Sequence, residues 1–279
     1  MLAYVRGRVG RREIKANTAV RLRSILMSFA ASYGKRRVAL LGPKAIERWL
    51  EERAPDLSPG SRRNEYQAVR QLVRWLIAER HIKSDPMAGM KAPKVPRSVP
   101  RAMPTADVDK LLGVLPDARA RLVVALMVRM GLRRNEVITV QVGDYDPEAE
   151  TLTVTGKGDH VRLLPVPPDV SQAIRAYLEV RGWTAGPMVL REDGAGGISN
   201  SRIGQMVRGY MEAAGVKQRP YDGRAPHALR HTAATKMVGV DPDLRVVQQF
   251  LGHASLISTQ RYLAHAEIGK IRQALEKTA

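Results

Sequence analysis

The 279-residue sequence contains no cysteine, which excludes disulfide frameworks, thiolate metal sites, iron–sulfur clusters and cysteine nucleophiles. Aromatic residues make up only 5% of the chain, which argues against a single-strand binder that stacks bases on aromatic rings. No apolar run reaches the roughly 18 to 20 residues of a membrane-spanning helix. The short apolar run at residues 24–31 lies inside a helix-period pattern, so we do not interpret it as a signal peptide. These absences fit a folded protein of a reducing cytosol.

Negative charge is also scarce, and the imbalance predicts a polyanionic partner. The chain has 46 Lys and Arg against 27 Asp and Glu, a formal net charge of +19. Residues 1–102 contain 23 basic and 8 acidic residues, whereas residues 103–279 contain 23 and 19. A hydrophobic content of 44% predicts real cores, so the excess charge belongs to a folded chain.

A proline-rich, basic segment at residues 91–104 separates two domains. Prolines remove backbone donors and hold the chain extended, so this segment predicts a semi-rigid linker between residues 1–97 and residues 98–279. Its four basic residues are Lys91, Lys94, Arg97 and Arg101. They fit either a simple solvated linker or a linker that crosses a nucleic-acid backbone.

Hydrophobic periodicity predicts a mainly α-helical fold with one small antiparallel β-sheet. In the all-helical first domain it predicts helices at residues 17–33, 43–53 and 61–81. The last helix has an apolar stripe and a separate basic stripe of Arg63, Arg70 and Arg74. The basic stripe is either a solvated face or a surface that contacts DNA.

The second domain is predicted to be α+β. A strongly apolar helix is expected at about residues 117–130. Two β-prone runs, residues 151–155 and 160–166, flank a turn-rich loop and predict a hairpin with Lys157 at its tip. Helical patterns dominate the rest of this domain.

Several short motifs of the second domain contain residues that could support chemistry, although none is decisive alone. They are Arg133 in GLRRNE, Lys157 in GKGD, His227 and Arg230 in HALRH, His253 in LGH and Tyr262 in STQRYLAH. The GKG segment is not a P-loop, which needs four residues between its glycines and Ser or Thr after the lysine. His227 and His231 are four residues apart, but no HExxH glutamate or cysteine accompanies them, so we predict no metal site.

Taken together and in this order, the six residues resemble the catalytic set of the tyrosine recombinase (phage integrase) family. The resemblance covers essentially the whole chain, and the layout is similar to that of Xer-type recombinases without an arm-binding domain. It implies a SAM-like core-binding domain at residues 1–97 and a catalytic domain at residues 98–279. The implied activity is that of a site-specific recombinase or integrase, which cleaves and rejoins duplex DNA through a 3′-phosphotyrosine without metal, ATP or another cofactor.

The resemblance assigns a role to each matching residue. Phosphodiester transfer places extra negative charge on the non-bridging oxygens, so the site needs fixed cations that face them. Arg133 and Arg230 would clamp the phosphate, and His253 would donate a hydrogen bond to the same oxygens. Glu136, three residues after Arg133, would hold that guanidinium in place.

Tyr262 would be the nucleophile. A phenol with a pKa of about 10 is only about 0.1% ionised at pH 7, so it needs a base and cationic surroundings. His227 is the candidate base, and Lys157 would protonate the departing 5′-oxygen as general acid. His231 is expected to support the structure.

The expected partner is duplex DNA with a specific core site, bound by a homotetramer that spans two sites; the need for an accessory directionality factor is left open. An apolar stripe follows Tyr262 and packs either on its own domain or on a neighbouring protomer: Ile268, Ile271 and Leu275. We expect the protein in the cytoplasm of a bacterium or of a phage-infected host cell. The alternatives are relaxation or resolution by the same chemistry, as in type IB topoisomerases, and a non-catalytic DNA-binding protein.

Overall fold

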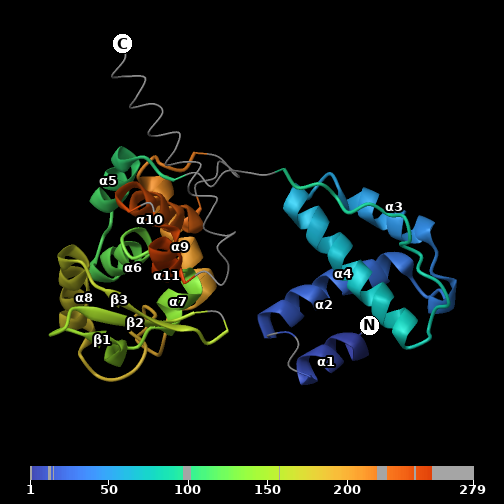
Figure 1. Cartoon of the computed structure of the whole chain (residues 1–279), viewed down its shortest axis with the longest axis horizontal. Helices are drawn as coiled ribbons and strands as arrows, with labels where there is room; N and C mark the ends of the chain where they lie inside the picture. The colour runs from blue at the N-terminus through green and yellow to red at the C-terminus, as the bar shows by residue number, and fades with distance from the viewer. Residues whose placement is uncertain are drawn as a thin grey trace, which may run out of the picture. The chain divides into compact units, whose positions relative to one another are not determined.

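The computed structural model describes residues 2–11, 14, 16–96, 102–156, 158–218, 225–241 and 243–252. The chain divides into two compact units, residues 1–98 and residues 99–279 (Figure 1). Each unit has its own hydrophobic core. The predicted fold class, mainly α-helical with one small antiparallel sheet, is confirmed. None of the helices in the described ranges is long and apolar enough to cross a membrane.

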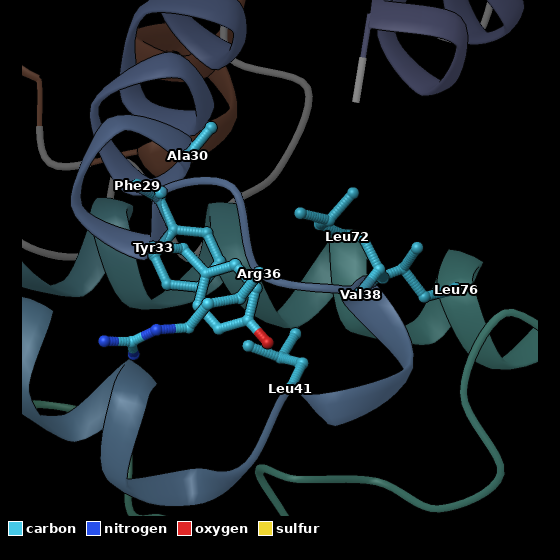
Figure 2. Close-up of a pocket in the computed structure, with 9 residues that line it drawn as sticks. Phe29, Ala30, Tyr33, Arg36, Val38, Leu41, Leu72 and Leu76 are labelled. Atoms are coloured by element: carbon cyan, nitrogen blue, oxygen red, sulfur yellow. The ribbon is translucent and has the colours of Figure 1, made fainter.

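The first unit is helical in its described residues. It contains α1 (Leu2–Gly10), α2 (Ala16–Tyr33), the 3-10 turn η1 (Val38–Leu40), α3 (Pro43–Arg53) and α4 (Pro59–Ala78). The core forms where the apolar stripes of α2, α3 and α4 meet, around Leu26, Trp49 and Val69. An apolar pocket is lined by α2, α4 and the segment between α2 and α3, with Phe29 and Leu72 among its walls (Figure 2).

Helix α4 ends three residues before the predicted boundary at residue 81. The His81 amide donates to the Leu76 carbonyl at 2.8 Å around Arg80, whose φ is +57°. This hydrogen bond, which encloses a residue in the left-handed conformation, defines a Schellman motif at the end of the helix. The helix therefore stops at Ala78.

The second unit is built around one apolar helix. Its elements are α5 (Thr105–Gly113), α6 (Ala118–Val128), α7 (Arg134–Thr139), the 3-10 turn η2 (Val142–Asp144), β1 (Tyr145–Asp146), β2 (Thr151–Thr155), β3 (Val161–Pro165), α8 (Pro168–Arg181), α9 (Asn200–Ala213), α10 (Pro226–Val240) and α11 (Leu244–Leu251). Asp117 begins α6 by accepting a hydrogen bond from the Ala120 amide at 2.7 Å. Most of the α6 side chains are buried, and the helix packs against α8, α10, α7 and α9 (Figure 1). Because a helix that is apolar all round is stable only inside a core, α6 organises the elements around it.

The sheet has the order β1–β2–β3, and both strand pairs are antiparallel. The predicted hairpin corresponds to β2 and β3, whereas the two-residue strand β1 was not predicted. Leu152 and Leu164 are paired and buried. Arg162 is two residues from Leu164 on β3 and pairs with the buried Val154, so it shares the core-facing side of the sheet.

Candidate active site

The segment between α6 and α7 brings Arg133 close to the end of α11. Gly131 in this segment has a φ of +64°, and a side chain there would meet Leu251 Cδ2 at 3.1 Å. Glycine therefore permits both the turn and the close approach. Arg133 is the N-cap residue of α7, and Glu136 in the first turn accepts a hydrogen bond from the Arg133 amide at 2.8 Å.

Glu136 is a buried carboxylate, 2% exposed, that three arginines surround. Its Oε1 accepts hydrogen bonds from Arg133 Nη1 at 2.7 Å and Arg162 Nη1 at 3.1 Å. Its Oε2 accepts one from Arg162 Nη2 at 2.9 Å and forms an ion pair with Arg230 Nη1 at 3.6 Å. We call these four side chains the arginine cluster. One carboxylate cannot neutralise three guanidiniums, so the cluster retains an excess of positive charge.

The ionised form of Glu136 is favoured despite its burial. Burial alone raises the pKa of this carboxyl, but Arg162, the Arg133 amide and the charge of Arg230 together lower it below its ordinary value of 4.5. The Arg162 hydrogen bond is the largest of these opposing effects. Glu136 therefore remains negative at neutral pH and holds the guanidiniums in defined positions.

Two arginines of the cluster also bind the C-terminal carbonyls of α11. Arg133 donates to the carbonyls of Leu251 and Gly252, each at 3.3 Å. Arg230 donates to the Leu251 carbonyl and to the Gly131 carbonyl. The last carbonyls of a helix lack intrahelical partners and carry the negative end of its dipole, so cations stabilise them. Two guanidiniums from distant parts of the sequence thus converge on the Leu251 oxygen.

The structure brings together three of the predicted site residues: Arg133, Glu136 and Arg230. His227 lies one turn before Arg230, exposed in the first turn of α10, and its ring centroid is 4.5 Å from that of His231. The other predicted catalytic residues lie outside the described residues: Lys157, His253 and Tyr262.

The basic residues predicted to contact DNA differ in their surroundings. Four are exposed on α4 or after it: Arg63, Arg74, Lys91 and Lys94. Arg70 instead donates to the Met87 carbonyl at 2.7 Å and pairs with Asp85 at 3.4 Å, so it ties the following segment to α4. Arg97 and Arg101 lie outside the described residues, as does the apolar stripe after Tyr262.

Arg162 is the member of the arginine cluster that the sequence analysis did not predict. The signal that could have revealed it is its strand position, because Arg162 alternates in phase with Leu164 and Val166, which are both buried. A charged side chain at a core-facing position requires a buried partner of opposite charge. That partner is Glu136.

Comparisons with known proteins identify a family for the part of the chain that contains the arginine cluster. Residues 101–268 match the model of the phage integrase family. Tyrosine recombinase XerC of Xanthomonas campestris is 30% identical over 259 residues, which cover 90% of this chain and 79% of that protein. A lambda integrase dimer bound to a COC′ core site has a similar fold, with a TM-score of 0.77 at 18% identity over 93% of this chain and 92% of that chain. A lambda integrase tetramer bound to a Holliday junction gives a TM-score of 0.76 at 18% identity, over 91% and 76% of the two chains.

Proposed function

The chain belongs to the phage integrase family and is a tyrosine-type site-specific recombinase that cleaves and rejoins DNA, and we propose that it does so through a 3′-phosphotyrosine bond at Tyr262. We assign residues 98–279 to the catalytic domain and residues 1–97 to a core-binding domain that grips the duplex. The family match at residues 101–268 and the basic N-terminal third support this division.

The observation that carries the proposal is the convergence of Arg133 and Arg230 on one carbonyl oxygen, that of Leu251. Guanidiniums that can share a carbonyl oxygen are also placed to share the oxygens of a phosphate. Because they are held before the reaction begins, they can stabilise the transition-state charge without reorganising. Arg133 is 30% exposed and Arg230 only 1%, so we expect DNA binding to uncover Arg230 before it contacts the phosphate.

In the proposed reaction, the Tyr262 hydroxyl gives its proton to His227 while its oxygen attacks the scissile phosphorus. The bond from phosphorus to the 5′-oxygen breaks, and Lys157 protonates that departing oxygen. The groups that stabilise the non-bridging oxygens are Arg133, Arg230 and His253. The phosphotyrosine retains an activated phosphate, so a 5′-hydroxyl of another strand can reverse these steps and rejoin the DNA.

We assign the first domain to binding the duplex through its backbone. Arg63 and Arg74 are eleven residues apart on α4, close to three full turns, so they project from the same exposed face. The basic residues of the linker can extend this contact: Lys91, Lys94, Arg97 and Arg101. Arg70 is paired with Asp85, and we assign it to stabilising the domain instead. Phosphate contacts release counterions, so binding should weaken steeply with salt.

We infer the assembly from the lambda integrase structures, which contain a dimer on a core site and a tetramer on a Holliday junction. By analogy, this chain would recognise a specific core site and act as a tetramer on two such sites in the cytoplasm. Recombination by the purified protein alone would show that no directionality factor is required. Dependence on a host extract would show that one is.

The test uses DNA that the chain itself selects. The Tyr262→Phe variant, which cannot form the covalent bond, is used to select bound fragments from a random duplex library. The selected site is then rebuilt as a nicked duplex from which the cleaved end dissociates; we call it the selected duplex. In the presence of a chelator, the wild type should form a covalent adduct, and Tyr262→Phe should bind without forming one.

Two outcomes would overturn parts of the proposal. An adduct with the Tyr262→Phe variant would mean that a different residue is the nucleophile. Relaxation of supercoiled DNA by monomers, with no exchange between two sites, would favour the topoisomerase-like alternative.

A further inference from the structure

Arg162 is a mostly buried arginine of β3 for which the proposed reaction has no role. Its side chain is 8% exposed and lies on the core-facing side of the hairpin. A guanidinium stays charged at any working pH, and its burial is unfavourable unless partners satisfy its donors and its charge. The partners of Arg162 therefore indicate what it does.

The guanidinium of Arg162 joins three elements of the second unit. Nη1 and Nη2 donate to the two oxygens of Glu136 at 3.1 and 2.9 Å, which is a bidentate pair. Nε donates to the Phe250 carbonyl at 3.1 Å. Arg162 thereby connects β3 with α7, which carries Glu136, and with α11, which carries Phe250. A lysine could not make this set of contacts, because its single ammonium lacks the planar fork.

Gly252 shows how closely Arg162 approaches the end of α11. A Cβ at Gly252 would lie 2.7 Å from Arg162 Nη1 and 3.1 Å from its Cζ, and the φ of Gly252 is +61°. Glycine provides the left-handed turn and leaves space for the guanidinium. Because His253 follows Gly252 in the sequence, Arg162 fixes the backbone from which the His253 segment departs.

Arg162 also determines how strongly Glu136 neutralises the two arginines of the proposed clamp. Both carboxylate oxygens accept hydrogen bonds from Arg162 and from Arg133. With Arg162 present, the negative charge is shared, and Arg133 and Arg230 keep more positive charge for a phosphate. Without Arg162, the carboxylate could turn towards those two arginines and cancel one of their charges.

We propose that Arg162 is a positioning residue for DNA cleavage: it fixes Glu136 and the end of α11 so that Arg133 and Arg230 face the scissile phosphate with their charge available. This inference rests on the proposed function, because Arg162 acts only through that clamp. The loop that carries Lys157 leads directly into β3, so Arg162 also ties the hairpin of the general acid to the clamp.

The experiment measures single-turnover cleavage of two versions of the selected duplex. One has the natural phosphate at the scissile position, and the other has a methylphosphonate, in which a methyl group replaces a charged oxygen. The variants are Arg162→Gln and Arg162→Lys. The matched control is Arg175→Gln, because Arg175 is an exposed arginine of α8 that donates to the Pro147 carbonyl. DNA affinity and thermal unfolding are measured for every variant.

The expected result is a loss of rate that depends on the charge of the substrate. Arg162→Gln should cleave the natural duplex about 10 to 100 times more slowly than the wild type, because small misplacements of catalytic groups have effects of this size. Its DNA affinity should change by less than about threefold, because the clamp contributes little to gripping the backbone at large. The loss should shrink on the methylphosphonate duplex, which needs less positive charge. Arg162→Lys should lose less rate than Arg162→Gln on the natural duplex, and its loss should also be smaller on the methylphosphonate duplex. Arg175→Gln should cleave both duplexes at the wild-type rate.

Equal losses on the two duplexes would overturn the inference, because a purely structural role would not distinguish a charged phosphate from a neutral one. Wild-type rates in Arg162→Gln would also overturn it. If Arg162→Gln does not fold, the same comparison is made with Arg162→Lys. Equal rate losses of that variant on the natural and the methylphosphonate duplex would then overturn the inference. Failure of the proposed function looks different, because the wild type would then form no adduct, or Tyr262→Phe would form one.

Discussion

Glu65 in the first unit and Glu136 in the second are both buried carboxylates bound by arginine, but they differ in the number of their partners. Arg53 binds Glu65 through hydrogen bonds of 2.8 and 2.6 Å, so one positive charge meets one negative charge. Arg53 also lies over the ring of Trp49, with its Cζ 5.6 Å from the ring centroid. Glu136 instead meets three arginines, and the charges do not balance.

The difference separates a pair that stabilises a fold from a cluster that can bind an anion. A balanced pair such as Arg53–Glu65 leaves no net charge for a ligand. Three guanidiniums around Glu136 repel one another, and the carbonyls at the end of α11 offset only part of that repulsion because they carry partial charges. In the proposed reaction, the scissile phosphate would supply the missing negative charge. The stability and the reactivity of the two sites should therefore respond differently to matched substitutions.

The largest contrast is expected between Arg230→Ala and Arg53→Ala. Loss of Arg230 removes a preorganised cation from the transition state, so cleavage of the selected duplex should fall by about 10² to 10³-fold. Arg53→Ala should lower the thermal stability of the first unit and leave the cleavage rate at saturating DNA unchanged. The rates are measured as adduct formation in a single turnover. Equal rate losses for the two variants would remove the distinction between the sites.

A second contrast uses two glycines with positive φ that follow helices. Gly34 ends α2 with a φ of +72° and has open space where a Cβ would be, whereas a Cβ at Gly252 would collide with Arg162. Gly34→Ala should destabilise the fold by about 1 to 2 kcal/mol through backbone strain alone and leave cleavage intact. Gly252→Ala should be more destabilising and should also slow cleavage, because Arg162 must move. Denaturant unfolding measures the loss of stability in both variants, and adduct formation measures cleavage. Normal cleavage by Gly252→Ala would contradict the predicted role of the close contact with Arg162.

Acid should weaken the arginine cluster through Glu136. The pKa of Glu136 is lowered on folding, so its ionised form stabilises the folded state above the ordinary value of 4.5. That stabilisation is lost as the pH falls below 4.5 and through the folded value. The melting temperature of the wild type should therefore drop more steeply than that of Glu136→Gln on acidification below this range. Parallel curves for the two proteins would show that Glu136 contributes nothing to the acid response.

The smallest effects are expected for single phosphate contacts of the first domain. Arg63→Gln and Arg74→Gln should each reduce the slope of log affinity against log salt by about 1, because one counterion fewer is released. Arg70→Gln should leave the slope unchanged and lower stability, because Arg70 is paired with Asp85. Fluorescence anisotropy over a range of salt concentrations measures these slopes. If only Arg70→Gln reduced the slope, Arg70 would be the residue that contacts DNA, and Arg63 and Arg74 would not.

The sequence analysis predicted the elements whose patterns are local. The hairpin was predicted because β-prone runs flank a glycine-rich turn, and α3 was predicted with the observed bounds, 43–53. Helix α1 was missed because, among its residues whose burial the structure describes, only Tyr4 and Val5 are buried, and Tyr4 packs on the distant Trp75 with ring centroids 5.4 Å apart. A pattern within nine residues cannot reveal that contact.

In the site, too, the sequence pattern revealed a contact between neighbouring residues but not one between residues far apart in the sequence. Glu136 was associated with Arg133 because the two residues are three positions apart, and the structure places their side chains 2.7 Å apart. The partnership of Glu136 with Arg162 joins residues 26 positions apart and depends on how the sheet packs against α7. Strand alternation marks Arg162 as core-facing, but only the fold identifies its partner.

The most direct test of the account is to locate the bond between protein and DNA. The wild-type adduct with the selected duplex is formed in the presence of a chelator and digested with protease and nuclease. The peptide that retains a nucleotide is then sequenced by mass spectrometry. We predict that the nucleotide is attached through its 3′-phosphate to Tyr262. A nucleotide on any other residue, or the absence of a covalent adduct, would contradict the account.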